Sequence, residues 1–214
     1  MTSVMLATYP EKFAGGAIIA GLPYGSAASI PQAFDRMRGH GGPDAAGLAA
    51  AVRSASKHKG SWPRVAIWHG TADHTVVASN GDAIVAQWLG VHDTSATPGE
   101  TGTIDGYPYR AWHDAAGRPV VEDYRITGMG HGVPLSTTGD DRCGISGAYM
   151  LDVGISSTRR IAASWGLADM PNPAVDRPVR GSAKPIDRPS PAMPPQTGVA
   201  KVIEDALRAA GLMR

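Results

Sequence analysis

Several classes of protein are excluded by what this chain of 214 residues has little of. It has one cysteine, Cys143, so it can form neither an internal disulfide nor a zinc site built from several cysteines. No apolar run is long enough to cross a bilayer, and the chain as written carries no basic, cleavable secretory signal. With 20 Lys and Arg against 19 Asp and Glu, it has no excess positive charge for binding nucleic acid.

Motifs for cofactors and metals are also missing. No phosphate-binding loop and no G-x-G-x-x-G segment follows an expected strand. Six of the seven histidines show no metal-ligand spacing with a carboxylate or with the cysteine: His40, His58, His69, His74, His92 and His113. We therefore expect no metal and no cofactor.

The composition divides the chain into three parts. Apolar residues make up 43% and charged residues 18%, as in ordinary globular proteins. Eight of the seventeen prolines fall between Asp169 and Gln196, which predicts an extended linker over 169–197. Apolar residues recur at helical spacing beyond it, which predicts a terminal helix over 198–214. The globular domain is then 1–168.

Within that domain, expected strands and helices alternate. Short apolar runs predict buried strands at 17–20 and 65–68, and two further strands at 109–112 and 120–127 flank a turn. Helices are expected at 2–9, 43–57, 79–91 and 155–165, the third with a capping-box start at Ser79 and Asp82. This alternation is typical of an α/β fold, a mostly parallel sheet flanked by helices.

Two short segments stand where such folds keep their chemistry, directly after strands. The first contains Asp73 and the second is a glycine-rich loop around His131. An acid followed by a histidine, each at the end of its own strand, fits the order Ser, Asp, His of an α/β hydrolase, in which the acid orients the imidazole. Taken singly, Asp73 is more often a turn residue and His131 an incidental surface residue. Their order and placement together favour catalysis.

The nucleophile that this pair would need is missing, because no G-x-S-x-G pentapeptide occurs in the sequence. Ser26, Ser146 and Ser182 each follow a glycine or lie near one, but none has the pattern, and each is expected to be a loop serine.

Five ordered segments resemble the poly(3-hydroxybutyrate) depolymerase family of esterases. They are Leu6–Pro10, Ala20–Gly25, Trp68–Asp73, Gly128–Gly132 and the stretch from Gly154 to Leu167. The resemblance implies an α/β-hydrolase fold, with Asp73 as the triad acid and His131 as the base. It also implies a serine esterase acting on small or polymeric esters, and an extracellular location, since many members are secreted. Tyr24, in a loop after a strand, is a weaker candidate for lining the substrate pocket.

The chain departs from the family at its start. In relatives the serine elbow lies just before the segment that begins here at Met1, so the resemblance implies that the nucleophile, the N-terminal strands and the oxyanion-hole amides lie upstream. Many relatives also have cysteine where this chain has Ser26, which leaves Cys143 without that partner.

The leading hypothesis is accordingly the C-terminal part of a carboxylic ester hydrolase, whose start codon has been placed too far downstream. On its own it should have little activity. One alternative is an inactive truncated remnant or a binding or regulatory module. Another is a partial domain that folds only with a complementing N-terminal segment.

Overall fold

The computed structural model describes residues 1–139 and 142–168. The expected linker and terminal helix lie outside the described residues. The helices are α1 (Thr2–Thr8), the 3-10 helix η1 (Pro10–Lys12), α2 (Ile30–Met37), α3 (Ala45–Ser54), α4 (Ser79–Val91) and α5 (Ser157–Ser164). The strands are β1 (Gly15–Ile19), β2 (Arg64–Gly70), β3 (Glu100–Ile104), β4 (Tyr107–His113), β5 (Pro119–Ile126), β6 (Val133–Leu135) and β7 (Met150–Asp152).

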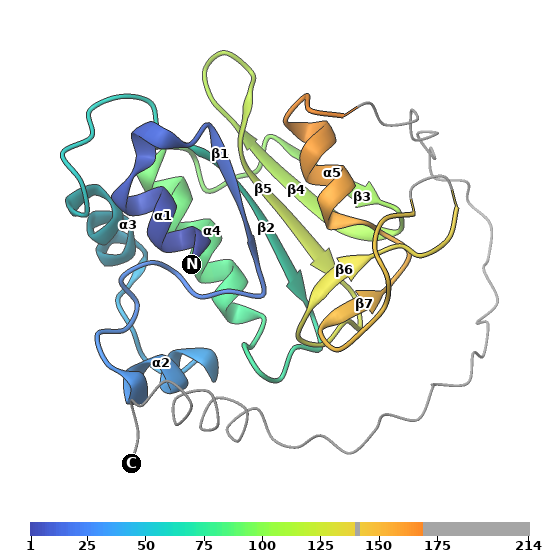
Figure 1. Ribbon diagram of the computed structural model, residues 1–214. Coiled ribbons are helices and arrows are strands. Elements are labelled where there is room, and N and C mark those ends of the chain that lie inside the picture. Colours follow the sequence, from blue (N-terminus) through green and yellow to red (C-terminus); the bar gives the residue numbers. More distant parts are fainter. Residues whose placement is uncertain (140–141, 169–214) are drawn as a thin grey trace. The chain divides into compact units, whose positions relative to one another are not determined.

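Five of these strands form one mixed sheet in the order β1-β2-β5-β4-β3 (Figure 1). The pairs β1/β2 and β2/β5 are parallel, because a helical crossover separates the members of each. The pairs β4/β5 and β3/β4 are antiparallel, because short turns join them. The expected α/β fold is confirmed, with parallel pairing in the half of the sheet where strands alternate with helices. The carboxyl ends of β1, β2 and β5 therefore meet at one edge.

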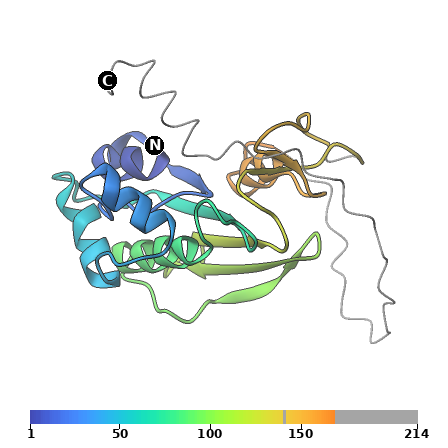
Figure 2. The same ribbon diagram turned by 90° about the horizontal axis from the view of Figure 1, so that it is seen from below.

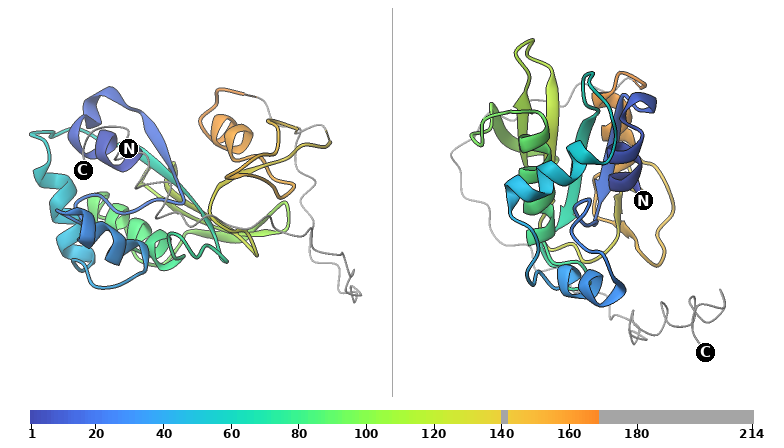
Figure 3. Two further views of the ribbon diagram at one scale, coloured as in Figure 1. Left: turned by 60° about the horizontal axis from the view of Figure 1, so that its bottom comes forward. Right: turned by 90° about the vertical axis from the view of Figure 1, so that its left-hand side faces the viewer.

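Apolar side chains cover both faces of this sheet. On one face Ile18, Val65, Ile67 and Val121 pack against α1, α3 and α4, with Trp88 of α4 fully buried. On the other face Trp68 stacks on Tyr124, with ring centroids 3.8 Å apart, under α5 and the small parallel sheet of β6 and β7. Figures 2 and 3 show α5 and β6–β7 on the side of the strands away from α3 and α4.

Some elements were not expected from the sequence. Strand β3 is exposed at four of its five residues, so it lacks an apolar pattern, and β6 and β7 have three residues each. Helix α2 buries none of its residues. The expected side-chain cap on the helix after β2 is wrong: Ala78 is the N-cap residue and provides no side-chain hydrogen bond, while Asp82 pairs with Arg125.

Candidate active site

The acid loop, residues 71–78, leaves the carboxyl end of β2 and holds Asp73 rigidly. The side chain of Asp73 is fully buried. Its Oδ1 accepts hydrogen bonds from the main-chain N–H groups of Thr75 (2.9 Å) and Val76 (2.8 Å). The loop thus turns around its own carboxylate and leaves Oδ2 for another donor.

The histidine loop, residues 127–132, leaves the neighbouring strand β5 and is joined to the acid loop through the main chain. The N–H of Ala72 donates to the carbonyl of Met129 (3.0 Å), and the N–H of Gly128 donates to the hydroxyl of Thr71 (2.9 Å). A β-carbon at Gly70 would overlap the Met129 carbonyl. Glycine at this position therefore lets the two loops meet backbone to backbone.

His131 and Asp73, which are 58 residues apart in the sequence, are brought into contact by this arrangement. Nδ1 of His131 lies 2.8 Å from Oδ2 of Asp73. The carboxylate can only accept, so Nδ1 donates and the neutral ring leaves Nε2 free to take a proton. The His131 side chain is 29% exposed, and Nε2 has no hydrogen-bond partner within residues 1–139 and 142–168. A buried acid behind a solvent-accessible base is the arrangement that general-base catalysis requires.

The charge on Asp73 is favoured by its surroundings. Burial by itself would raise the pKa of this carboxyl, but the hydrogen bonds from His131 and from the N–H groups of Val76 and Thr75 outweigh burial and lower it below the ordinary value. Asp73 is therefore ionised at neutral pH and able to stabilise an imidazolium at His131.

Comparison with known proteins places the chain in a family. No family model matches the chain. The poly(3-hydroxyalkanoate) depolymerase C of Paucimonas lemoignei is 43% identical over 169 residues, which is 78% of this chain and 41% of that protein. The chain belongs to the poly(3-hydroxybutyrate) depolymerase family of esterases.

Other members of this wider group of esterases are also similar. An acetylxylan esterase of Coprinopsis cinerea is 33% identical, over 64% of this chain and 38% of its own length. The solved acetyl xylan esterase of Aspergillus awamori superposes with a TM-score of 0.54 at 27% identity, over 61% of this chain and 49% of that structure. The chain spans about two fifths of the length of the curated relatives.

Tyr24 is the remaining site residue expected from the sequence. Its main-chain N–H and C=O are both bound by the buried side chain of Gln87, at 3.0 and 2.8 Å. Its side chain lines a groove of about 570 Å³ after the end of β1, which neither Asp73 nor His131 lines. The groove and the pair share one edge of the sheet, because β1 and β2 are parallel neighbours.

Two residues beside the pair were not singled out from the sequence. Tyr149 places its ring edge to face with the His131 ring, with centroids 5.9 Å apart, and holds a left-handed backbone at φ 61°. His69 is fully buried, and its Nε2 lies 3.6 Å from Oδ2 of Asp73. The motif around His69 is visible in the sequence, but the contact of its ring with the acid depends on how the loop after β2 folds back.

Within residues 1–139 and 142–168, no three His, Cys, Asp or Glu side chains gather closely enough to bind a metal. In the same ranges, no helix has the length and apolar character needed to cross a membrane.

Proposed function

We propose that this chain supplies the acid and the base of a carboxylic ester hydrolase that works through a serine nucleophile. The contact between Nδ1 of His131 and Asp73 at 2.8 Å supports this most directly, together with the esterase and depolymerase relatives. The substrate class is a carboxylic ester, small or polymeric.

In this mechanism Nε2 of His131 takes the proton of a serine hydroxyl as the serine oxygen attacks the ester carbonyl. Asp73 holds the ring and stabilises the imidazolium. The imidazolium then gives its proton to the leaving alcohol. Water, deprotonated by His131, then attacks the acyl-serine carbonyl. As the bond to the serine oxygen breaks, His131 returns the proton to that oxygen, and the carboxylic acid is released.

We propose that this serine is supplied from outside the described residues. No hydroxyl among them hydrogen-bonds to the His131 ring. The hydroxyls of Ser26 and Ser136 donate instead to nearby carbonyls, and that of Ser157 donates to the carbonyl of Pro134. Ser182 lies outside the described residues. The serine would be carried by a segment that precedes Met1 in the full-length protein, or by a separate complementing segment.

The groove at Tyr24 is a candidate for holding part of the ester. It follows the end of β1, at the sheet edge from which the Asp73 and His131 loops also emerge. Its lining includes apolar side chains such as Ile18, Ile19 and Leu22, which suits an aliphatic group.

The test begins with the coding DNA upstream of Met1, where an in-frame G-x-S-x-G is expected. The chain extended to include it should hydrolyse p-nitrophenyl butyrate, and His131→Ala and the serine substitution should each abolish turnover. The 214-residue chain should show little activity. Strong turnover by that chain, abolished by His131→Ala, would contradict an external serine, and an inactive extended chain would contradict the hydrolase itself.

A non-catalytic binding or regulatory module is the second candidate, because the expected nucleophile motif is absent from the sequence. A stop codon or unrelated sequence upstream would favour it. An extracellular location stays a prediction from the family resemblance.

A further inference from the structure

Two residues on neighbouring strands form hydrogen bonds with the main chain of the acid loop. His69 of β2 and Arg125 of β5 are opposite each other in the parallel register. Nε2 of His69 donates to the carbonyl of Val76 (2.7 Å), and a guanidinium nitrogen of Arg125 donates to the carbonyl of Ala78 (3.1 Å). The N–H of Val76 in turn donates to Asp73. One peptide segment therefore connects both strands to the acid.

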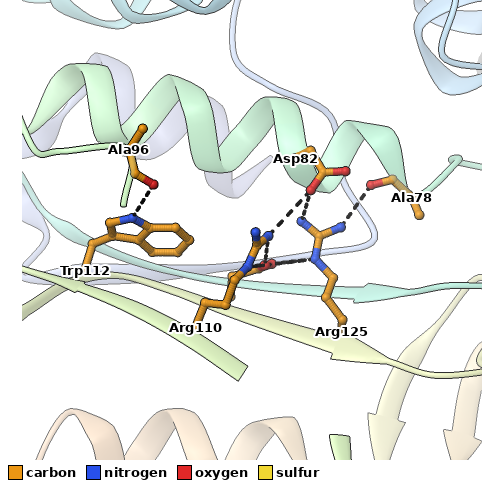
Figure 4. Close-up of polar contacts among 7 residues, drawn as sticks. Ala78, Asp82, Ala96, Arg110, Trp112 and Arg125 are labelled. Carbon is orange, nitrogen blue, oxygen red and sulfur yellow. Dashed lines mark hydrogen bonds and ion pairs between the residues drawn. The ribbon is translucent and has the colours of Figure 1, made fainter. Parts of the chain in front are cut away.

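The Arg125 guanidinium is fixed on three sides (Figure 4). Its Nε donates to the fully buried carboxylate of Asp123 (2.8 Å), which also accepts from Arg110 (2.6 Å), and a terminal nitrogen donates to Asp82 (2.9 Å). A β-carbon at Gly81 would lie 2.8 Å from the guanidinium, so glycine in the first turn of α4 leaves room for it. The two arginines neutralise the fully buried Asp123 carboxylate, while the Asp82 carboxylate, which is 64% exposed, completes the charge balance at the surface.

His69 complements this arrangement as a neutral donor. Burial, together with the nearby Arg125 charge, lowers the pKa of His69, even though the contact with Val76 and the charge of Asp73 act in the opposite direction. Because the Val76 carbonyl can only accept, the proton sits on Nε2. The unprotonated Nδ1 is buried without a hydrogen-bond partner in the described part of the chain.

We propose that His69 and Arg125 are positioning residues for the acid. By fixing the carbonyls of Val76 and Ala78, they keep the Asp73 carboxylate in line with Nδ1 of His131. Neither touches the reacting atoms. This inference rests on the proposed function for the catalytic role of Asp73 and His131. The hydrogen bonds that hold the acid loop do not depend on a nucleophile.

The test follows the proton between His131 and Asp73 by NMR in the full 214-residue chain labelled with ¹⁵N-histidine. A proton on Nδ1 that is bonded to a carboxylate gives a downfield resonance with slow solvent exchange, assigned by its loss in Asp73→Asn. His69→Phe and Arg125→Met should remove this resonance or speed its exchange at least tenfold. His69→Gln, which restores a donor, should recover it.

Arg118→Met is the matched control. Arg118 also lies on the β4–β5 hairpin, but it pairs with Asp114 at the turn and its side chain is 75% exposed. This variant should keep the resonance and its exchange rate.

If Arg125→Met fails to fold, Arg125→Lys keeps the charge beside Asp123 but lacks the fork that reaches Ala78 and Asp82 together, and it should speed exchange at least threefold. Folded His69→Phe and Arg125 variants that exchange at the wild-type rate would overturn the proposal.

The kinetic readout separates this inference from the proposed function. In the extended, active chain, Arg125→Met should lower kcat with KM unchanged, because substrate binding is untouched. An extended chain without hydrolysis would remove the proposed function yet leave the NMR result standing. Unchanged exchange in an active extended chain would remove only the positioning role.

Discussion

Gly70 of β2 and Met129 of the histidine loop meet main chain to main chain. The β-carbon of any other residue at position 70 would overlap the Met129 carbonyl, whose carbon would lie 2.7 Å away. The contact sets the spacing between the loops that carry Asp73 and His131.

Gly70→Ala should therefore destabilise the protein and separate the loops. The obstacle is backbone, which cannot rotate away, so we expect a loss of about 1–3 kcal/mol in the free energy of unfolding, measured by urea denaturation. Gly130→Ala is the control within the same loop, because a β-carbon there meets nothing within 4 Å and the backbone is not left-handed. Equal stability of the two variants would refute the argument.

Asp73→Asn should lower esterase kcat of the extended chain by about 10⁴-fold while leaving the fold intact, because an amide presents the wrong partner to the His131 ring. The assay is hydrolysis of p-nitrophenyl butyrate. Asp93→Asn is the control, since the Asp93 carboxylate, just beyond the end of α4, is 84% exposed and pairs with Arg53 of α3. Full activity of Asp73→Asn would remove the acid role.

Stability should fall in mild acid because of His69. Burial keeps its folded-state pKa below the ordinary histidine value of about 6.5, so the unfolded chain takes up the proton first. The contribution of His69 to the free energy of unfolding is therefore complete above about pH 6.5. It declines below that pH by at most about 1.4 kcal/mol per pH unit for one proton.

Urea unfolding measures how the free energy of unfolding changes between about pH 5 and pH 8, a range that includes the ordinary histidine pKa. His69→Gln should reduce this slope but leave the part due to His92, whose pKa is also lowered by burial. His40→Gln, at an exposed position, is the matched loss of an imidazole. Asp73 acts in a separate window: its pKa is lowered, so its contribution disappears only as the pH falls below about 3.9, the ordinary value for aspartate. An unchanged slope in His69→Gln would show that this ring is not buried as a neutral group.

Glu122→Leu should loosen the face of the sheet under α5. This carboxylate is 5% exposed and accepts hydrogen bonds from Tyr109 (3.1 Å), Tyr124 (3.2 Å) and Ser164 of α5 (2.6 Å). Its removal leaves three hydroxyls without their acceptor, at a cost of about 1–3 kcal/mol.

The readout for Glu122→Leu is the thermal midpoint, with Glu100→Leu on the exposed strand β3 as the control. Midpoints lowered equally in both variants would contradict a specific role for Glu122.

The sequence predicted those parts of the fold that have a strong local pattern. The apolar runs at Val65–Trp68 and Val120–Thr127 gave β2 and β5, and the glycines around His131 marked the loop that follows. The pairing of Asp73 with His131 could be expected because carboxyl ends of parallel strands share an edge.

What could not be predicted depends on register and on contacts between distant segments. To expect that His69 lies opposite Arg125, one must know that β2 pairs with β5 as well as with β1, and not with β3, the next strand in the sequence. In the sequence, the buried carboxylates of Asp123 and Glu122 are only polar interruptions of a strand, because their partners on β4, β5 and α5 are not known from it. Strand β3 is exposed at four of its five residues and so has no apolar pattern that would predict it.

The position of β1 at the end of the sheet order has a geometric consequence of its own. Its residues Gly15–Ile19 carry no charge, and within the described part of the chain the main-chain groups on its outer side have no strand to bind. A strand added there in parallel would be aligned by the ladder alone. Its last residue would lie at the same edge of the sheet as Asp73 and His131. The hydrogen-bond register between the two strands would then fix how far a side chain on that last residue lies from the pair.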